Sequence, residues 1–271
     1  MEQLIFVAFA FECPECQHGD FYYMPSPNVV ASSDYGPIIV NAHDTFIGRS
    51  ILRVGSWEKI ELGLLVQLLD IMLKNREHIL AYDVGANIGI HSLALARHFG
   101  PRIKIRAFEA QRPLYHMLCG TLALNNILSV TAHHNAVSTK TGDTITITLP
   151  DYNLPNNFGS FEVMPPRLSD NQSMTRSYAE TVNTIALDEF DEIVDLIKMD
   201  IEGMENQALI GAKKLFEKCR PAVFIEILKT DRDFVAEFFK TRGYQGFQVG
   251  GNLLALPHNF PVPVQGLHAL F

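Results

Sequence analysis

The chain has 271 residues, 47% of them hydrophobic, which is enough for one sizeable α/β domain with additions. Its 30 acidic residues outnumber its 22 lysines and arginines, and a net charge of −8 without a basic run argues against a nucleic-acid substrate, since duplex binding requires a positive surface. No apolar run reaches the roughly 20 residues that cross a membrane, and four cysteines with one C-x-x-C pair suggest no disulfide framework, so we expect a cytoplasmic protein.

Residues 1–55 are expected to form a small β-rich cap. They lack helical periodicity and carry several turn-forming prolines, and short apolar runs predict strands at residues 4–11, 21–24 and 37–41. The first run is a poor signal peptide, because no Lys or Arg precedes it and Glu12 ends it. Cys13 and Cys16 lack the second ligand pair that zinc needs, so free thiols in a turn are expected.

An amphipathic helix is expected over residues 57–73, followed by a strand, a glycine loop and a second helix. The apolar run 79–84 predicts a buried strand, Gly85 and Gly89 bracket a tight loop, and helical spacing begins at Ile90. This order is typical of a nucleotide-binding turn, because glycine lets the backbone approach a ligand and a helix N-terminus offers free N–H groups.

The spacing of this loop indicates which ligand it suits. The dinucleotide fingerprint G-x-G-x-x-G is absent, because position 87 is Asn and the bracketing glycines are too far apart. Asp83 at the strand end would repel a pyrophosphate and suits a ligand with a cationic head. The segment from Asp83 to Gly89 resembles the first motif of S-adenosylmethionine (SAM) methyltransferases, whose cofactor carries an ammonium and a sulfonium group.

The second predicted strand, residues 103–108, ends in Glu109. A carboxylate in that place holds a ribose diol in nucleotide-binding α/β folds, because its two oxygens accept two hydroxyl protons. A third strand over residues 130–137 carries His133 and His134, which point to opposite faces and are therefore not expected to share a metal.

A long irregular segment, residues 150–180, follows an alternating strand at residues 145–149. It is rich in Pro, Asn, Ser, Asp and Gly. Segments longer than about 12–15 residues without secondary structure are usually functional lids or disordered in compact domains. We therefore expect an active-site lid here.

Two further strands are expected at residues 194–200 and 222–228, each followed by a helix, with a closing pair at residues 244–249 and 253–257. The repeated alternation of strand and helix implies a parallel sheet with helices on both faces. Asp200 ends the first of these strands. Ligands in such sheets bind at the carboxyl ends of the strands, where the strand order reverses.

Four segments occur in an order that resembles the FkbM family of SAM-dependent methyltransferases, and the Lys-x-Asp-x-Glu-Gly segment is the most specific of them. They are Asp83–Gly89, Phe108–Gln111, Asn157–Ser160 and Ile197–Gly203. Three stretches resemble the N-terminal part of the same family, namely Ile38–Asn41, Phe46–Ser50 and Glu61. The resemblance covers about residues 36–228, and we expect substrate choice to lie outside it.

The resemblance implies a Rossmann-like class I methyltransferase sheet of order 3-2-1-4-5-7-6 over residues 56–271, with SAM as the cofactor. In that order Asp83 and Asp200 would end adjacent strands at one crevice, with Glu109 one strand further out, and three carboxylates would attract a cationic cofactor. The implied cofactor-binding residues are Glu61, then Asp83, Gly85, Asn87 and Gly89 at the methionine end, Glu109 at the ribose, and Asn135 and Ala136 near the adenine.

The implied reaction is methyl transfer to a hydroxyl of a sugar or polyketide-type natural product, with Asp200 and Glu202 facing the sulfonium and the acceptor. A sugar hydroxyl needs a general base, for which Asp200 is the leading candidate, followed by Glu202 and Glu226. Glu202 could instead cap the following helix, and Glu226 could pair with Lys198 or Arg220. Asp200 with Glu202 or Glu226 could also hold Mg²⁺, although we assign no metal.

Two other classes compete with this interpretation. A nicotinamide dehydrogenase is disfavoured by the missing middle glycine and by the lack of an obvious Tyr-x-x-x-Lys pair. In a non-catalytic SAM- or nucleotide-binding module the carboxylates would be structural. The sequence indicates a small-molecule acceptor without identifying it, and it leaves a homodimer open.

Overall fold

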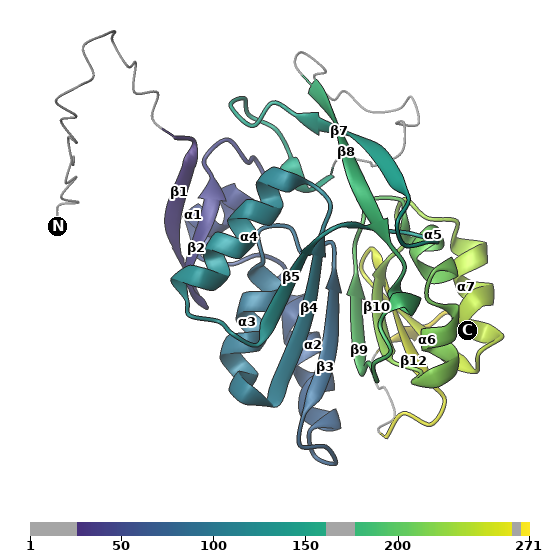
Figure 1. Cartoon of the computed structure of the whole chain (residues 1–271). Coiled ribbons are helices and arrows are strands. Elements are labelled where there is room, and N and C mark those ends of the chain that lie inside the picture. Colours follow the sequence, from purple (N-terminus) through teal and green to yellow (C-terminus); the bar gives the residue numbers. More distant parts are fainter. Residues whose placement is uncertain (1–25, 161–176, 262–266) are drawn as a thin grey trace, which may run out of the picture.

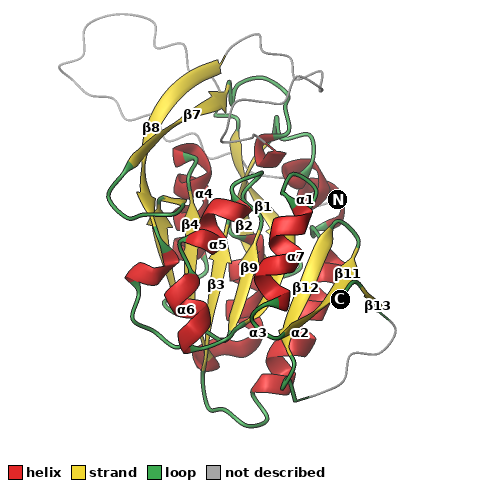
Figure 2. Ribbon diagram, turned by 90° about the vertical axis from the view of Figure 1, so that its right-hand side faces the viewer, coloured by secondary structure: helices red, strands yellow, loops and turns green. Residues whose placement is uncertain are grey.

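The computed structural model describes residues 26–160, 177–261 and 267–271. Its centre is an eight-stranded sheet in the order β13-β11-β12-β10-β9-β3-β4-β5 (Figures 1 and 2). The strands are β3 (Ile79–Val84), β4 (Ile103–Glu109), β5 (Val130–His134), β9 (Leu196–Met199), β10 (Ala222–Glu226), β11 (Tyr244–Val249), β12 (Asn252–Pro257) and β13 (His268–Ala269).

The strand order confirms the predicted one. Strands β5, β4, β3, β9 and β10 are parallel neighbours, whereas β12 is antiparallel to both β10 and β11. Counted along the chain, the order is 3-2-1-4-5-7-6, to which β13 adds a short edge strand that the sequence did not indicate. The order reverses between β3 and β9, which is where sheets of this kind bind ligands.

Helices cover both faces of the sheet (Figure 2). They are α2 (Lys59–Met72), α3 (Ile90–Phe99) and α4 (Arg112–Leu124) on one face, and α5 (Glu205–Ile210), α6 (Lys213–Lys218) and α7 (Arg232–Lys240) on the other. In β3, Ile79 and Ala81 belong to one hydrophobic cluster, and Tyr82 and Val84 to the other. Alternate residues of a strand point to opposite faces, so β3, which is apolar except for the buried Asp83, is covered on both. Among the described helices, none has the length and apolar character needed to cross a membrane.

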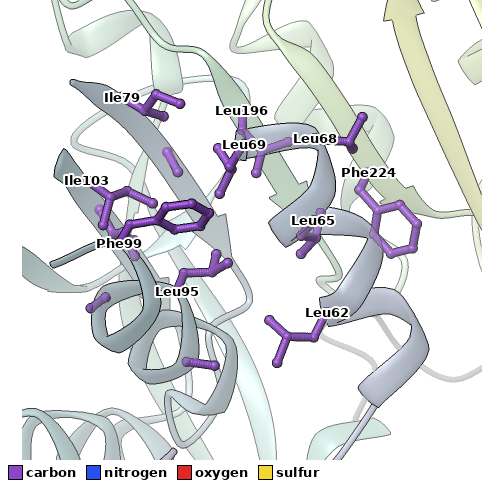
Figure 3. Packing of buried hydrophobic residues seen from close by; sticks show 14 of the residues in the cluster. Leu62, Leu65, Leu68, Leu69, Ile79, Leu95, Phe99, Ile103, Leu196 and Phe224 are labelled. Carbon is purple, nitrogen blue, oxygen red and sulfur yellow. The ribbon is translucent and has the colours of Figure 1, made fainter. Parts of the chain in front are cut away.

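Leucines of α2 lie at the centre of the first cluster. Leu62, Leu65 and Leu69 are buried, and in Figure 3 they lie on the side of the helix that faces Phe99 and Ile79. Their spacing of three and four residues puts them on one helical face, as the predicted amphipathic helix requires. Burying such a side chain stabilises the fold by about 1.5–3 kcal/mol.

The described part of the expected N-terminal cap is a hairpin and a helix. Strands β1 (Asn28–Ser33) and β2 (Gly36–Asn41) pair antiparallel, which confirms the strand predicted at residues 37–41. Helix α1 (Ile47–Val54) corrects the expectation of a cap without helical periodicity. It buries only Ile47, Gly48 and Ile51, and eight residues are too few for a repeat to be visible in the sequence. Outside the described residues lie the strands predicted at 4–11 and 21–24 and the cysteines Cys13 and Cys16.

The cap shares a hydrophobic cluster with the main sheet's helices. Ile38 and Val40 of β2 belong to the same cluster as Leu114 and Met117 of α4. The backbone N–H of Ile39 also donates to Oγ1 of Thr121 in α4, at 3.1 Å. The domain boundary near residue 55 stays a prediction.

A smaller sheet lies above the main one in Figure 1. Strands β7 (Thr144–Pro150) and β8 (Ser177–Ile185) pair antiparallel, and β6 (Ala136–Val137) joins β8. The expectation of an irregular segment over residues 150–180 is wrong at its end, because residues 177–180 pair along β7. Residues 161–176 lie outside the described chain, so the lid stays a prediction.

Candidate active site

A cavity of about 430 Å³ lies at the carboxyl ends of β3, β4, β9 and β10. This volume falls in the range of about 300–1,000 Å³ that is typical of small-molecule sites. Of the eleven residues expected at the site, eight line it, namely Gly85, Asn87, Glu109, Asn135, Ala136, Asp200, Glu202 and Glu226. The other three, Glu61, Asp83 and Gly89, are not part of its wall.

The loop after β3 depends on Gly85. Its φ is +81°, in the left-handed region, and a Cβ there would lie 1.7 Å from the backbone oxygen of Asp200. Glycine therefore allows the loop to cross the end of β9 in direct contact. The N–H groups of Gly85 and Ala86 both donate to the carbonyl of Phe108 at 2.9 Å, which ties the loop to β4.

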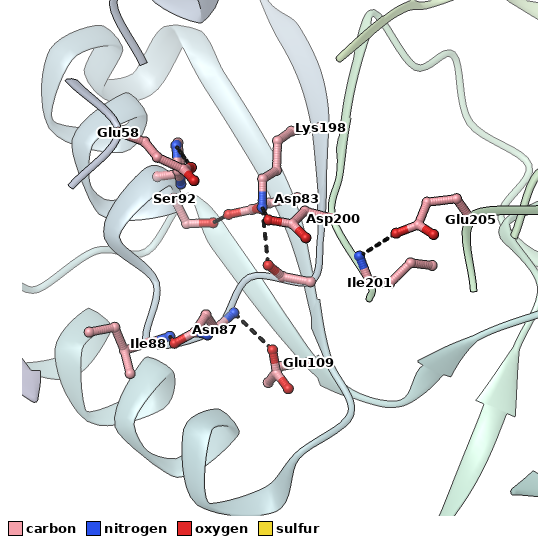
Figure 4. Close-up of polar contacts among 12 residues, drawn as sticks. Glu58, Asp83, Asn87, Ile88, Ser92, Glu109, Lys198, Asp200, Ile201 and Glu205 are labelled. Atoms are coloured by element: carbon pink, nitrogen blue, oxygen red, sulfur yellow. Dashed lines mark hydrogen bonds and ion pairs between the residues drawn. The ribbon is translucent and has the colours of Figure 1, made fainter. Parts of the chain in front are cut away.

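Asp83 lies beneath this loop. It is 3% exposed, its Oδ2 accepts the Ser92 hydroxyl at 2.7 Å, and its Oδ1 is 3.9 Å from Nζ of Lys198 (Figure 4). Its charge is thus engaged inside the protein. The expectation that Asp83 faces the cationic head of a ligand is therefore not supported by its position.

Lys198 opens the Lys-x-Asp-x-Glu-Gly segment, and the only role considered for it from the sequence was as a possible partner of Glu226. Its Nζ is 3.8 Å from Oδ2 of Asp200, 3.9 Å from Asp83, and donates to the carbonyl of Gly85 at 3.2 Å. Burial alone would lower the pKa of Lys198, but nearby carboxylates, led by Asp200 and Asp83, more than offset it and hold the pKa above its ordinary value. The sequence signal for a functional role of Lys198 was a lysine inside a buried apolar strand, because a lysine is rarely buried unless it is paired.

The alternative in which Glu226 pairs with Lys198 or Arg220 is wrong. Lys198 pairs with the two aspartates instead, and Arg220 donates to the carbonyls of Arg242 and Gly243 at 2.7 and 2.8 Å. Oε2 of Glu226 is buried without a hydrogen-bond partner among the described residues. Burial, together with repulsion from neighbouring carboxylates, raises the pKa of Glu226 to about 8.

Glu109 is held by the backbone around it. Its Oε2 accepts the N–H of Asn87 and its Oε1 accepts the N–H of Gln111, both at 2.8 Å (Figure 4). Burial raises the pKa of Glu109 to about 7 although both hydrogen bonds oppose the shift. Each carboxylate oxygen has a second lone pair, so the fixed side chain can still accept two ligand hydroxyls.

The motif Asn157–Ser160 packs against the same side of the cavity. Phe158 is fully buried, and its carbonyl accepts Nε2 of Gln111 at 3.0 Å. The hydroxyl of Tyr152 donates to Oε1 of Gln111 at 2.7 Å, so this amide is satisfied at both ends. A Cβ at Gly159 would meet Nδ2 of Asn87 at 3.1 Å, which shows how closely the motif approaches the glycine loop.

The β10 side of the cavity gathers carboxylates. One carboxylate oxygen each from Asp200, Glu205 and Glu226 lie within 4.8 Å of one another. Within residues 26–160, 177–261 and 267–271, Oδ1 of Asp200 is buried without a hydrogen-bond partner, like Oε2 of Glu226. Glu202 is not in this group, so of the two Mg²⁺ pairings left open by the sequence only Asp200 with Glu226 has suitable geometry.

Two roles were open for Glu202, facing the cavity or capping the following helix, and the structure divides them between Glu202 and Glu205. Glu205, fully buried, accepts the N–H groups of Ile201 and Gly203 at 2.9 and 3.0 Å and so satisfies the backbone that precedes α5. Glu202, with φ +55°, turns toward the cavity and pairs with Lys229 at 2.5 Å. Burial raises the pKa of Glu202 to about 7, with Lys229 opposing.

At the start of α2 the structure brings Glu58, and not Glu61, to the cavity wall. Oε2 of Glu58 lies 3.5 Å from Nε2 of His91, which also lines the cavity. No sequence signal could have found Glu58, because its side chain is turned inward by a left-handed backbone directly before the helix.

The paired histidines of β5 pack on aromatic rings. His133 stacks on Phe108 with ring centroids 4.9 Å apart, and His134 stacks on Tyr115 at 5.1 Å. They belong to no potential metal group among the residues that the structure describes.

These features fit SAM. The cavity combines a close-approach glycine loop, a fixed carboxylate with free lone pairs for a diol, and wall carboxylates suited to cationic groups. Phe46, Ile47 and Trp57 add apolar surface to the same wall.

Comparison with known proteins points to a methyltransferase family. The family model described as Methyltransferase FkbM domain matches residues 83–245. Methyltransferase sdnD of Sordaria araneosa is 34% identical over 122 residues, which are 44% of this chain and 42% of that protein, so the chain covers less than half of this relative's length.

Two solved structures to which the chain is similar carry methyltransferase in their names. Methyltransferase FkbM from Methylobacillus flagellatus has a TM-score of 0.46 at 19% identity, covering 66% of this chain and 43% of its own. A SAM-dependent O-methyltransferase from Thermotoga maritima has a TM-score of 0.43 at 13% identity, covering 90% and 72%. The family match leaves the dehydrogenase alternative without support and agrees with SAM as the cofactor. The chain belongs to the FkbM methyltransferase family.

Proposed function

We propose that this protein is an O-methyltransferase that uses SAM to methylate a hydroxyl of a sugar or natural product, with Asp200 as the general base. The observation that carries the proposal is the free oxygen of Asp200, which is buried beside the cavity, at the point where the strand order reverses, without a partner in the part of the chain that the structure describes. A cytoplasmic location and a homodimer stay predictions.

The cofactor would be held on the glycine-loop side. Glu109 would accept the ribose hydroxyls through its remaining lone pairs, and Asn135 and Ala136 would border the adenine. When bound, SAM supplies an electrophilic methyl group on a sulfonium. The protein's own contribution is alignment, which can be worth several kcal/mol and up to about 7–11 kcal/mol in model reactions.

The acceptor hydroxyl would be placed at the β10 side. Oδ2 of Asp200 faces Lys198 at 3.8 Å, which fixes the carboxylate and leaves Oδ1 to accept the hydroxyl proton. A positioned base of this kind contributes about 10²–10⁴ in rate. Glu226, whose pKa is about 8, lies close enough to share the proton.

The wall also restricts the acceptor. On the β10 side Asp200 pairs with Lys198 and Glu202 with Lys229. Burial raises the pKa of Glu226 to about 8, and Leu228 adds apolar surface. A neutral hydroxylated molecule therefore fits better than a phosphorylated sugar, because both lysines of the wall already have carboxylate partners.

The test is transfer of a labelled methyl group from SAM to a panel of sugars and macrolide-type alcohols, with the product's methylated atom assigned by NMR. A methyl ether is the expected product. A methylated nitrogen or carbon would overturn the O-methyl assignment. A bound ligand adds RT ln(1+[L]/Kd) to the free energy of unfolding and so raises the melting temperature. If neither SAM nor its demethylated product raises it, the cofactor proposal is wrong.

A further inference from the structure

A cationic ligand head needs a carboxylate at the cavity wall, and Asp83 does not supply one. Its side chain is 4% exposed and is absent from the wall. One oxygen accepts the Ser92 hydroxyl and the other lies next to Lys198. The group that receives an ammonium must therefore be sought elsewhere along the wall.

Glu58 presents a carboxylate at that wall. Its backbone has φ 47° and ψ 46°, the left-handed region, which non-glycine residues rarely adopt. The side chain does not cap α2, although it stands at the cap position. Strained backbone persists where its surroundings enforce it and gathers at functional sites. Here the strain turns the carboxylate toward the cavity instead of toward the helix.

The carboxylate of Glu58 has no full counter-charge. Its ion-pair partner among the described residues is His91, at 3.5 Å, and burial lowers the pKa of His91 to about 4, so this imidazole is neutral near pH 7. Lys198 is near enough to lower the pKa of Glu58, but burial outweighs it and the pKa is raised overall. A bound cation would supply what is missing, because an opposite charge favours the ionised form.

The position of Glu58 suits the amino-acid tail of the cofactor. In Figure 4 Glu58 lies near Ser92, whereas Glu109 lies beside Asn87 at the opposite end of the group. A nucleoside whose ribose is held at Glu109 must extend its tail past the glycine loop. On that side the wall offers Glu58 and His91, from the starts of α2 and α3.

We propose that Glu58, oriented by His91, forms the subsite for the α-ammonium group of the SAM methionine tail, the role that the sequence suggested for Asp83. The inference rests on the proposed function, since it takes SAM as the cofactor. Of the other wall carboxylates near the loop, Glu202 is paired with Lys229, and Asp200, whose Oδ2 faces Lys198, is the one proposed to act on the acceptor.

Two ligands that differ only at the tail test it. S-Adenosylhomocysteine carries the ammonium, whereas 5′-methylthioadenosine has the same nucleoside without the amino acid. Titration calorimetry on Glu58→Gln should show the affinity for S-adenosylhomocysteine falling at least tenfold, as expected for the loss of a hydrogen bond to a charged group. The affinity for methylthioadenosine should stay within twofold of wild type. Asp70→Asn, an exposed residue of α2, is the matched control and should change neither.

Each outcome decides a separate point. Wild-type protein that binds neither ligand overturns the proposed function itself. Wild-type binding of both, with full affinity of Glu58→Gln for S-adenosylhomocysteine, overturns only the ammonium subsite. An equal fall in affinity for both ligands would show that Glu58 supports the cavity as a whole, and it would also overturn the ammonium subsite. If Glu58→Gln does not fold, Glu58→Asp is measured instead, because its shorter side chain keeps the negative charge but moves it away from the cavity. The affinity for S-adenosylhomocysteine should then fall, and the affinity for methylthioadenosine should not.

Discussion

The two sides of the cavity treat their carboxylates differently. On the glycine-loop side, both oxygens of Glu109 accept backbone N–H groups. On the β10 side, Asp200 and Glu226 each keep one buried oxygen that has no hydrogen-bond partner in the described structure. A satisfied carboxylate is rigid and suits binding, whereas an unsatisfied one is costly for stability and can accept a proton or a ligand. The difference suggests that one side is built to hold and the other to react.

Lys198 joins the two sides, and its removal should have the largest effect. Lys198→Met leaves Asp83 and Asp200 facing each other across a buried site without their cation. Removing one partner of a buried ion pair typically costs about 3–5 kcal/mol. Urea unfolding should show a loss of that size. Lys218→Met is the control, since its partner Asp191 is 97% exposed, and such surface pairs contribute about 0–1 kcal/mol. Similar losses in both variants would contradict the role given to Lys198.

Asp200→Asn should separate reaction from binding. The substitution keeps the shape of the side chain but removes its ability to take a proton. We expect kcat to fall at least about 10²-fold while the affinity for S-adenosylhomocysteine stays within a few fold. Initial rates and calorimetry measure the two quantities. A kcat near wild type would exclude Asp200 as the base and make Glu226 the next candidate. If activity also requires Mg²⁺ and is abolished by EDTA, the carboxylates hold a metal instead.

The sheet was predictable from the sequence because its signals are local and repeated. Apolar runs separated by helical periods predict the strands and a parallel sheet, whereas the strand order came from the family resemblance. Gly85 is required by a backbone contact that no other residue permits. The direction in which each carboxylate points was not predictable. At the β9–α5 turn, positive φ at Glu202 and Gly203 turns Glu202 toward the cavity and Glu205 onto the backbone.

Because side-chain direction was not predictable, Glu61 was expected at the site where the structure has Glu58. Glu58 and Glu61 are one helical turn apart, and both precede the glycine loop. Only the left-handed backbone at Glu58 places its side chain at the cavity wall, and nothing in a Trp-Glu-Lys sequence announces that conformation.

Glu109→Gln should weaken binding without removing catalysis. An amide has one acceptor oxygen, so one of the two N–H groups now held at 2.8 Å would lose its partner, and a ribose hydroxyl would lose its carboxylate. We expect a loss of about 1.5–3 kcal/mol in S-adenosylhomocysteine affinity, measured by calorimetry. At saturating SAM, kcat should stay within a few fold of wild type. Unchanged affinity would remove the ribose assignment and with it the comparison between a binding side and a reacting side.

The smallest effect concerns the stability of the ligand-free protein and its dependence on pH. Burial raises the pKa of Glu109 and Glu202 to about 7 and that of Glu226 to about 8, from an ordinary value of 4.5. Between the ordinary and the raised values the folded protein binds more protons than the unfolded chain, so the free energy of unfolding falls as pH rises. His91, with its pKa lowered to about 4 from 6.5, acts in the opposite sense but only below about pH 6.5.

The window from pH 6.5 to 8.5 therefore isolates the carboxylates. Scanning calorimetry at constant ionic strength should show the melting temperature falling by a few degrees across it, given that about 1 kcal/mol corresponds to 2–4 °C in a chain of this size. Glu226→Gln cannot ionise, so its melting temperature should fall less steeply than that of wild type over the same window. Bound S-adenosylhomocysteine should leave the contribution of Glu226 in place, because that residue lies on the reacting side. Parallel curves for wild type and Glu226→Gln would mean that Glu226 is already ionised in the folded protein, and its unpartnered oxygen would then need a cation to explain it.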